Sequence, residues 1–355
     1  MRKSGHKNDR AVAFWLWTGA GLVLLMVAIG GITRLTGSGL SMTDWNLLLG
    51  AVPPTGHESW MEVFNRYKQF PEYQQVNAGM TLAEFKKIYF WEYLHRVTGR
   101  FIGIVFVGPF LWFWYRGYFN RTQLKKLLGL FLLGAAQGGM GWFMVKSGLV
   151  DVPYVSHYRL AAHLVLAFLL FGFCVWLALD LQRADANKTT VRASNTDGLF
   201  GWMYGIGALL VLQVVWGALV AGLKAGYIYN SFPLMNGMVL PGTVWSLEPL
   251  ILNFVENPAL VQWSHRILGT LLAGMVILFW VRVVAENRDR PILLRLTVLV
   301  VFVLLQYLLG VFTLVYNVPL ALAVAHQVMA LLVFGAWIVL LHHLKQGTKI
   351  RHETS

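Results

Sequence analysis

Residues 92–99 read EYLHRVTG, and residues 262–269 read QWSHRILG. Each stretch carries a histidine–arginine pair followed three residues later by glycine, and each begins a long apolar run. The two histidines, His95 and His265, are 170 residues apart in a chain of 355 residues. A motif that recurs at this separation indicates an internal duplication.

Two further pairs of segments match in the same way. Residues 162–167 (AHLVLA) match residues 325–330 (AHQVMA), and residues 136–141 match residues 305–310 through a shared glutamine and glycine. We therefore expect two four-helix bundles fused in the same orientation. The N-terminal bundle is predicted to span residues 1–182 and the C-terminal bundle residues 183–355.

Composition places the chain in a membrane. Hydrophobic residues make up 57% of the chain and charged residues 13%, whereas a soluble domain has about 25% charged residues. Runs of about 20 apolar residues can cross a bilayer, and the sequence contains eight: 12–33, 90–115, 127–145, 158–181, 199–222, 261–284, 293–315 and 319–342. The predicted fold is an all-α integral membrane protein with eight transmembrane helices in two repeated four-helix bundles. Cys174 is the only cysteine, so an internal disulfide is excluded.

The net charge of +13 reflects orientation in the membrane. Of the 29 basic residues, 18 lie in the N-terminus, in the second, fourth and sixth connections and in the C-terminal tail. The positive-inside rule assigns these segments to the cytoplasm, so both termini are expected there. Because topology accounts for the basic residues, a nucleic-acid partner is not expected.

Two long connections, about 34–88 and 223–260, are then on the outer side. Apolar residues in the first of them recur at helical spacing, at Trp60, Val63, Phe64 and Tyr67. This spacing predicts an amphipathic helix, which we expect to lie on the membrane. Residues 81–84 (TLAE) have the spacing of a capping box, so the second long helix is expected to begin well before the membrane.

Four histidines are candidate functional residues: His95, His163, His265 and His326. Each lies four to seven residues inside the outer edge of its span, or about 6 to 10 Å deep at 1.5 Å per residue. An ionisable side chain at this depth is costly unless it is paired or ligated. A single histidine could simply bond a neighbouring helix, but four at similar depth on four helices favour ligation.

Paired histidines from facing helices suit a metal or a haem. A zinc or copper site would bring three or four ligands together, often with thiolate or carboxylate. Two histidines per bundle, among glycine and aromatic residues, favour one bis-histidine haem in each bundle. Arg96, Arg100 and Arg266 could pair with haem propionates at the outer rim, or extend to the membrane interface as ordinary interfacial arginines.

The two bundles differ at one position beside the histidines. Glu92 lies three residues before His95, on the same helix face, whereas the second repeat has Gln262. A carboxylate can accept or donate a proton, and a neutral amide suits a resident cofactor. We infer that the first bundle performs the chemistry while the second holds a fixed redox haem. The alternative is that Glu92 is a structural acid paired with Lys86 or Lys87.

The sequence resembles the haem A synthase family along nearly its whole length. The resemblance lies in residues 30–41 (GGITRLTGSGLS), Glu92 with His95-Arg96, 157–163 (HYRLAAH), 230–237 (NSFPLMNG), 263–266 (WSHR) and 325–327 (AHQ). The outer-loop motifs are most similar to the branch found in mitochondria and alphaproteobacteria. Some bacterial relatives carry a cysteine pair in an outer loop, which this chain lacks.

The resemblance implies oxidation of the C8 methyl group of haem O to a formyl group, by successive hydroxylations and loss of water, to give haem A. It implies that His95 and His163 are axial ligands of the substrate haem, that Glu92 serves catalysis, and that His265 and His326 ligate a haem B cofactor. The implied partners are a haem O synthase, cytochrome oxidase assembly proteins, membrane lipid and an electron-transfer partner, either ferredoxin-like or quinone-linked. A homo-oligomer is left open.

Two other functions remain open at this point: a two-haem membrane cytochrome b that carries electrons, and a haem carrier or transporter. A carboxylate in only one half argues against a symmetric electron carrier, and no matched pair of broken helices indicates a transporter. Because no transit-like segment precedes the first span, a bacterial inner membrane is the expected location.

Overall fold

The computed structural model describes residues 3–43, 52–146, 153–185 and 198–354, which form helices and connecting loops with no strand among them. The long helices are α1 (Lys3–Leu35), α4 (Leu82–Tyr115), α5 (Arg121–Lys146), α6 (His157–Asp185), α7 (Leu199–Gly222), α9 (Pro258–Ala285), α10 (Arg290–Val315) and α11 (Leu320–Thr354). Short helices fill two connections: α2 (His57–Tyr67), α3 (Pro71–Gln75), η3 (Ala225–Tyr227), η4 (Gly242–Trp245), η5 (Leu250–Leu252) and α8 (Asn253–Glu256).

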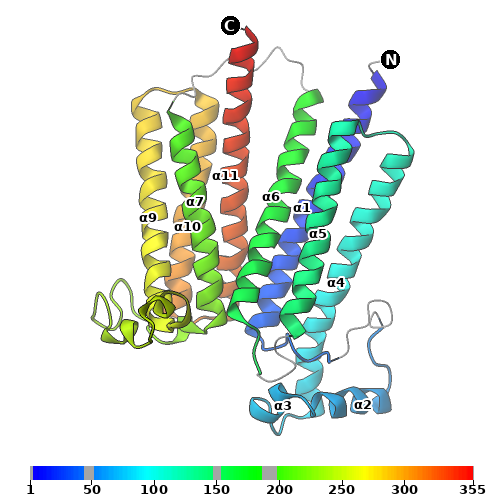
Figure 1. Cartoon of the computed structure of the whole chain (residues 1–355), viewed down its shortest axis with the longest axis vertical. Helices are drawn as coiled ribbons and strands as arrows, with labels where there is room; N and C mark the ends of the chain where they lie inside the picture. Colours follow the sequence, from blue (N-terminus) through cyan, green and yellow to red (C-terminus); the bar gives the residue numbers. More distant parts are fainter. Residues whose placement is uncertain (1–2, 44–51, 147–152, 186–197, 355) are drawn as a thin grey trace.

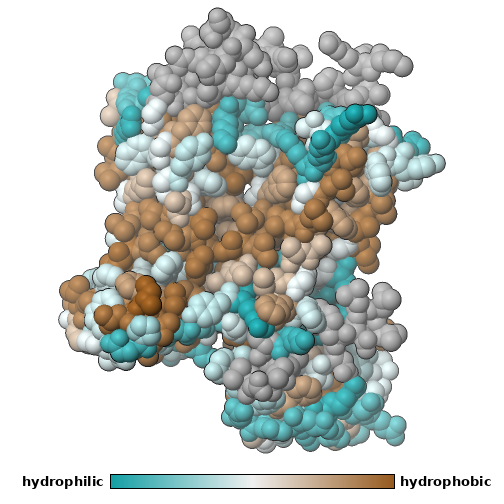
Figure 2. Space-filling model, in the orientation of Figure 1, coloured by the Kyte–Doolittle hydropathy of each residue, from teal (hydrophilic) through white to brown (hydrophobic). Residues whose placement is uncertain are grey.

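The prediction of an all-α membrane protein with eight spans is confirmed. Among the described residues, the eight long helices are each long and apolar enough to cross a membrane. Each predicted span coincides with its helix or lies inside it, to within one residue. On the face shown in Figure 2, apolar side chains form a belt across the middle of the molecule, with hydrophilic residues above and below it. A belt of this kind is the surface that a bilayer covers.

The long helices stand side by side in two groups, α1 with α4–α6 and α7 with α9–α11 (Figure 1). In the first group α1 packs along α4 and α6, and in the second α7 packs along α9 while α10 packs along α11. The groups meet where α6 contacts α7 and where α11 contacts α1 and α6. One apolar cluster combines buried residues of α1 and α6 with Leu331, Phe334 and Ile338 of α11. Because the groups share this core, the division into residues 1–182 and 183–355 stays a prediction.

The two long connections lie at the end of the molecule opposite to both termini (Figure 1). The predicted helix in the first connection is present as α2, but its apolar face packs on another helix. Phe64 and Tyr67 are buried against Phe85 and Tyr89, on the part of α4 that extends beyond the apolar belt. Aromatic side chains therefore hold α2 on α4, which leaves that face unavailable to lipid.

The start of α4 is fixed by the predicted capping box. Thr81 Oγ1 accepts a hydrogen bond from the Glu84 backbone N–H at 3.3 Å, and Glu84 Oε2 accepts one from the Thr81 N–H at 2.8 Å. These bonds satisfy two N–H groups that would otherwise lack a partner in the first turn. As a result α4 begins at Leu82, eight residues before the predicted span.

Contact between α7 and α11 within the second group generates a prediction for α7. A Cβ atom at Gly207 would overlap the Trp337 ring of α11, and the Trp337 indole N–H donates a hydrogen bond to the Met203 carbonyl at 2.9 Å. We expect Gly207→Ala to lower stability by about 1–3 kcal/mol, because the ring has no room to retreat. Thermal unfolding in detergent measures this effect. Gly201→Ala is the control, since a Cβ there meets nothing within 4 Å, and equal unfolding temperatures for the two variants would contradict the prediction.

The first outer connection, which contains α2 and α3, also contains a buried acid, Glu72. Its Oε2 accepts a hydrogen bond from the Tyr67 hydroxyl at 3.0 Å, and that hydroxyl accepts one from Asn77 Nδ2 at 2.7 Å. Burial raises the pKa of Glu72 from 4.5 to about 7, against the opposing effect of the Tyr67 hydrogen bond.

This raised pKa predicts a pH-dependent segment. Because the pKa of Glu72 is higher in the folded state than in the unfolded state, the folded state favours the protonated acid. The folded segment containing α2 and α3 is therefore most stable below about pH 4.5, the pKa of the unfolded state. Its free energy of unfolding falls by up to about 3 kcal/mol as the pH rises through 7. We expect amide hydrogen exchange of residues 57–75, corrected for intrinsic rates, to be faster at about pH 8 than at about pH 5.5. Glu72→Gln should remove the difference, and Glu58→Gln on the exposed face of α2 should keep it. The same pH difference in Glu72→Gln would show that another group is responsible.

Candidate functional site: two histidine pairs between membrane-crossing helices

The four predicted histidines lie on four membrane-crossing helices and come together two by two. His265 on α9 faces His326 on α11, with ring centres 6.5 Å apart and ring planes at 81°. His95 on α4 and His163 on α6 are close enough to interact electrostatically. The structure therefore brings together the same pairs that the sequence analysis joined.

Each histidine packs against a glycine of a neighbouring helix. A Cβ atom on any of these glycines would lie 2.8 to 3.2 Å from an imidazole atom, which is closer than ordinary van der Waals contact. The pairs are Gly30 with His95, Gly141 with His163, Gly217 with His265 and Gly310 with His326. The absence of a side chain at these positions lets each pair of helices approach at the level of the imidazole.

One helical turn before three of these glycines lies a glutamine, and it contacts the same histidine as the glycine does. The Gln Nε2 lies 3.3 to 3.4 Å from the imidazole Nε2 in the pairs Gln137–His163, Gln213–His265 and Gln306–His326. One turn before Gly30, the corresponding residue is Met26. The helix that faces His95 therefore carries a thioether at the sequence position where the other three carry an amide.

The glutamines determine which imidazole nitrogen carries the proton. A side-chain amide N–H can only donate, so the imidazole Nε2 must be the acceptor and Nδ1 carries the proton. In His326 this Nδ1 donates to the Gln306 carbonyl at 3.2 Å. The lone pair on Nε2 accepts the amide hydrogen bond, and a metal that binds Nε2 would replace that bond. The glutamines thus hold these histidines in the tautomer that binds a metal through Nε2.

Several buried polar atoms around the histidines have no hydrogen-bond partner within the described segments. They are Oε1 of Gln137, Gln213 and Gln306 and Nδ1 of His163 and His265. Buried polar atoms are nearly always paired. Their concentration beside both histidine pairs fits sites that take up a polar or metal-containing ligand.

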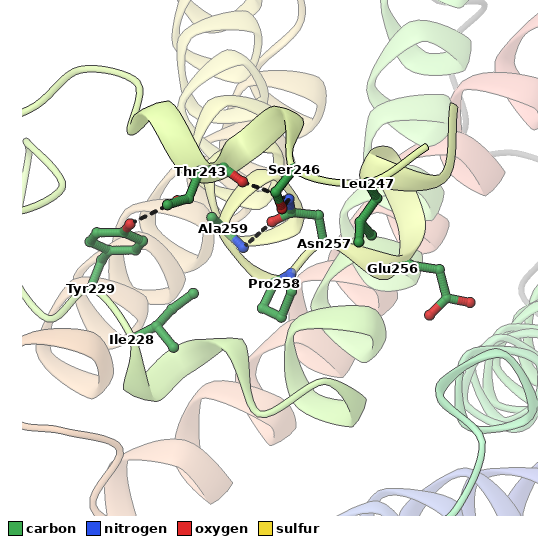
Figure 3. A pocket seen from close by; sticks show the side chains of 9 residues that line it. All are labelled: Ile228, Tyr229, Thr243, Ser246, Leu247, Glu256, Asn257, Pro258 and Ala259. Carbon is green, nitrogen blue, oxygen red and sulfur yellow. Dashed lines mark hydrogen bonds between the residues drawn. The ribbon is translucent and has the colours of Figure 1, made fainter. Parts of the chain in front are cut away.

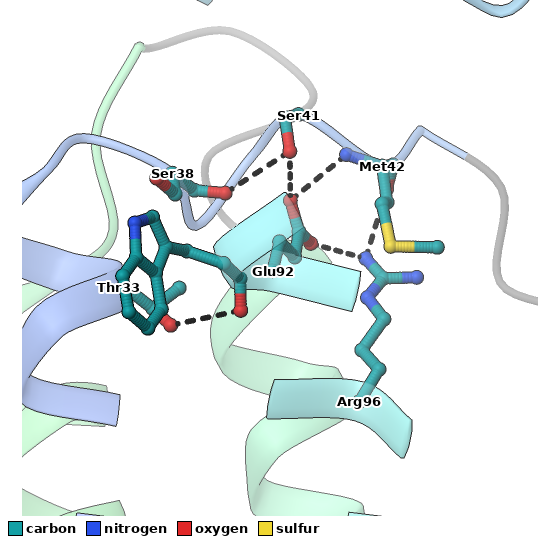
Figure 4. A network of polar contacts seen from close by, with 7 residues as sticks. Thr33, Ser38, Ser41, Met42, Glu92 and Arg96 are labelled. Atoms are coloured by element: carbon teal, nitrogen blue, oxygen red, sulfur yellow. Dashed lines mark hydrogen bonds and ion pairs between the residues drawn. The ribbon is translucent and has the colours of Figure 1, made fainter. Parts of the chain in front are cut away.

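Glu92 is buried, with 3% of its surface exposed, at the centre of a polar network (Figure 4). Its Oε2 accepts hydrogen bonds from Ser41 Oγ and from the Met42 backbone N–H, both at 2.8 Å. Its Oε1 pairs with Arg96 Nη2 at 2.6 Å, and the same Nη2 donates to the Met42 carbonyl at 2.8 Å. Glu92 and Arg96 together fasten the loop after α1 to α4.

Gln262 and Arg266 perform the equivalent fastening in the second half. Gln262 Nε2 donates to the Tyr229 carbonyl at 3.1 Å, and Arg266 Nη2 donates to the same carbonyl at 2.8 Å. Arg266 Nη1 donates to the Ser231 carbonyl at 2.9 Å. Both halves therefore use a pair of residues spaced i, i+4 to hold an outer loop, but only the first half has a carboxylate in the pair.

The other residues expected near the site are placed as follows. Arg96 and Arg266 direct their guanidinium groups to the loops, and Arg100 lies one turn beyond Arg96 on α4. A contact of these arginines with a propionate stays a prediction. Glu92 forms its ion pair with Arg96, whereas the alternative had paired it with Lys86 or Lys87. The Lys86 ammonium lies over the Trp60 ring.

A separate cavity lies under the second outer connection (Figure 3). Asn257 caps α9 there by accepting a hydrogen bond from the Ala259 N–H at 2.9 Å, and its Nδ2 donates to the Thr243 carbonyl at 2.8 Å. The residues lining the cavity are Ile228, Tyr229, Thr243, Ser246, Leu247, Glu256, Asn257, Pro258 and Ala259. None of the four histidines is among them, so this cavity is not the histidine site.

Gln213, Met26 and Met42 were not among the residues predicted from the sequence. Gln213 had a signal, because it precedes Gly217 with the same spacing that separates Gln137 from Gly141. Ser41 ends the motif at residues 30–41, but its contact with Glu92 and that of Met42 had no signal, because a loop about 50 residues away from Glu92 in the chain places them.

Comparison with known proteins identifies relatives along nearly the whole chain. A protein named "Heme A synthase" from Paramagnetospirillum magneticum is 48% identical, over 95% of this chain and 97% of its own length. Proteins of the same name from Nitrosospira multiformis and Flavobacterium johnsoniae are 45% and 42% identical, covering 95% and 96% of this chain and 94% and 99% of their own lengths.

The model of the family described as COX15-CtaA, cytochrome oxidase assembly protein, matches residues 13–338. This range contains both histidine pairs, Glu92 and Arg96. The chain therefore belongs to the COX15-CtaA family of cytochrome oxidase assembly proteins.

Proposed function

We propose that the chain is an oxidoreductase that converts haem O to haem A. It oxidises the C8 methyl group of the porphyrin to a formyl group by successive hydroxylations and loss of water. The observation that carries this proposal is that two matching histidine pairs are present, and only one has a buried carboxylate one turn away, Glu92. The name "Heme A synthase" of the relatives supports it. An electron carrier needs no proton acceptor in one half alone, so that alternative is not favoured.

The second histidine pair fits a haem B cofactor. The 6.5 Å between the ring centres of His265 and His326 leaves room for one metal atom with two bonds of about 2 Å. The surrounding amides of Gln213, Gln262 and Gln306 are neutral and suit a group that stays bound. When bound, haem B supplies one-electron redox chemistry. The two histidines would hold its iron, and Gly217 and Gly310 leave the imidazoles their space.

We assign the substrate haem to the first pair, with His95 and His163 as axial ligands and Glu92 as the proton acceptor. Oxidation of a methyl group releases protons, so an acceptor near the reacting edge is required. The Ser41 hydroxyl has one proton and two acceptors in reach, Glu92 Oε2 at 2.8 Å and the Ser38 carbonyl at 3.1 Å. When the hydroxyl turns to Ser38, a lone pair on Oε2 becomes free. A proton taken up on Oε2 can then be donated to Ser41 Oγ, while Arg96 keeps Oε1 in place.

The proposed location is a bacterial inner membrane with both termini in the cytoplasm. Both termini lie at one end of the molecule (Figure 1), and the basic residues Arg121, Lys125 and Lys126 begin α5 at that same end. The positive-inside rule favours the cytoplasm for it. The proposed partners are a haem O synthase that supplies the substrate, an electron-transfer partner, and cytochrome oxidase assembly proteins that act on the product.

The first test replaces the proposed proton acceptor. In cells that co-express a haem O synthase, we expect Glu92→Gln to lower haem A formation by about 10²-fold, because a positioned proton acceptor contributes on that order. Gln262 holds the equivalent loop in the second half, so glutamine should preserve the fold at position 92. Chromatography of extracted haems measures haem O, the hydroxylated intermediate and haem A.

Glu84→Gln is the matched control, because glutamine also completes a capping box. The control should form haem A at the unaltered rate. Undiminished haem A in Glu92→Gln would remove Glu92 from the mechanism. If the unaltered chain leaves haem O unchanged, the proposed function itself is wrong.

The second test concerns the cofactor. We expect His265→Ala and His326→Ala each to remove the low-spin haem B signal from the purified protein, because a bis-histidine site loses an axial ligand. Visible and electron paramagnetic resonance spectra measure this signal. The control is His57→Ala, because His57 is an exposed residue of α2 outside both histidine pairs. Retention of the low-spin signal in both variants would contradict the assignment of these ligands.

A further inference from the structure

The contacts with the histidines align the helices of the two halves residue by residue. Gln137 and Gly141 of α5 contact His163 as Gln306 and Gly310 of α10 contact His326. The residue after each glutamine therefore occupies the same place, which makes Gly138 the counterpart of Tyr307. Counting five residues from His95 and from His265 makes Arg100 of α4 the counterpart of Thr270 of α9.

In the second half these positions form a bridge between helices. The Tyr307 hydroxyl lies 3.1 Å from Thr270 Oγ1, which joins α10 to α9 at the lipid-facing surface. The Phe232 ring of the outer connection meets the Tyr307 ring edge-on, with centres 6.1 Å apart. Along this seam, α9 packs against α10. The second histidine pair is therefore closed off from lipid on this side.

In the first half α5 has Gly138 at the position of Tyr307, so α5 contributes no side chain there to a bridge like that of Tyr307 and Thr270. The helices α4 and α5 approach closely at hardly any point. Their ring contacts lie further toward the termini, where Phe131 meets Phe106 at 6.2 Å and Phe110 at 6.5 Å. A Cβ atom at Gly134, Gly138 or Gly139 would meet nothing within 4 Å.

Buried polar atoms of the first pair stand beside this seam without partners. Gln137, the neighbour of Gly138, has an unpaired buried Oε1, and His163, which it contacts, has an unpaired Nδ1 among the described residues. Gln137 lies one residue along α5 from Gly138, which puts these polar atoms at the level of the seam. A haem with a long isoprenoid tail is costly to move through water, which favours entry from the bilayer between two helices.

Resting on the proposed function, we propose that the seam between α4 and α5 at Gly138 is the lateral entrance of the substrate haem. The Tyr307–Thr270 bridge closes the equivalent seam around the resident haem. The first half exchanges its haem with the bilayer, and the second half retains its own. One duplicated bundle thus provides both a passing site and a permanent one.

The entrance is tested by filling it. In full-length protein that carries haem B, we expect Gly138→Tyr to slow the uptake of haem O from phospholipid vesicles about tenfold, which corresponds to roughly 1.4 kcal/mol in the barrier. Gly139→Tyr adds the same ring one residue away, where the counterpart Leu308 is 49% exposed and faces lipid. This control should take up haem O at the unaltered rate. Equal rates of haem O uptake by Gly138→Tyr and Gly139→Tyr would contradict the proposal that the haem enters at Gly138.

The bridge is tested by removing it. We expect Tyr307→Gly to transfer haem B to apomyoglobin about tenfold faster than the unaltered protein, and Tyr307→Phe, which keeps the ring and loses the hydroxyl, to fall between them. If Tyr307→Gly does not fold, Thr270→Val tests the same hydrogen bond. Unchanged transfer in folded variants would overturn the bridge. A wild-type protein that binds neither haem would overturn the proposed function, and the inference with it.

Discussion

Each of the four histidines faces a glycine on a neighbouring helix, and this glycine leaves room for the imidazole between the helices. An imidazole in hydrocarbon needs a hydrogen bond or a ligand, and both must come from a neighbouring helix. A side chain at Gly141 or Gly310 would push the imidazole out of this space. Close approach then brings the amides of Gln137 and Gln306 within reach one turn away. The pairing of the histidines follows from this packing, and the metal-binding tautomer follows from the amides.

The fold was largely predictable from the sequence, and the site only in part. Apolar runs locate helices because their length must match the bilayer, and the recurring motif singled out His95 and His265 from ten histidines. The partners of those residues depend on the register between helices. Periodicity gives the face of a helix and not the neighbour it meets, so the contact of His265 with Gln213 was not found. Two donors to Glu92, the Ser41 hydroxyl and the Met42 N–H, come from a loop about 50 residues earlier in the chain, and the path of that loop has no sequence signature.

The two halves share a loop fastening that differs in charge. In the first half the guanidinium of Arg96 is neutralised by Glu92 inside the fastening. In the second half Arg266 meets backbone carbonyls and the neutral Gln262 lies beside it. Within the fastening itself, the second half thus keeps a positive charge that the first half cancels. The carboxylate is what distinguishes the two fastenings, and only the first can take up a proton there.

The length of α4 has a mechanical consequence. At 1.5 Å per residue its 34 residues form a rod of about 50 Å. The outer part of the rod carries α2 through Phe85 and Tyr89, and its next turns carry Glu92 and His95. No proline interrupts the helix before Pro109. Because α4 is unbroken between these residues, a protein that binds α2 and displaces it would also displace Glu92 and His95.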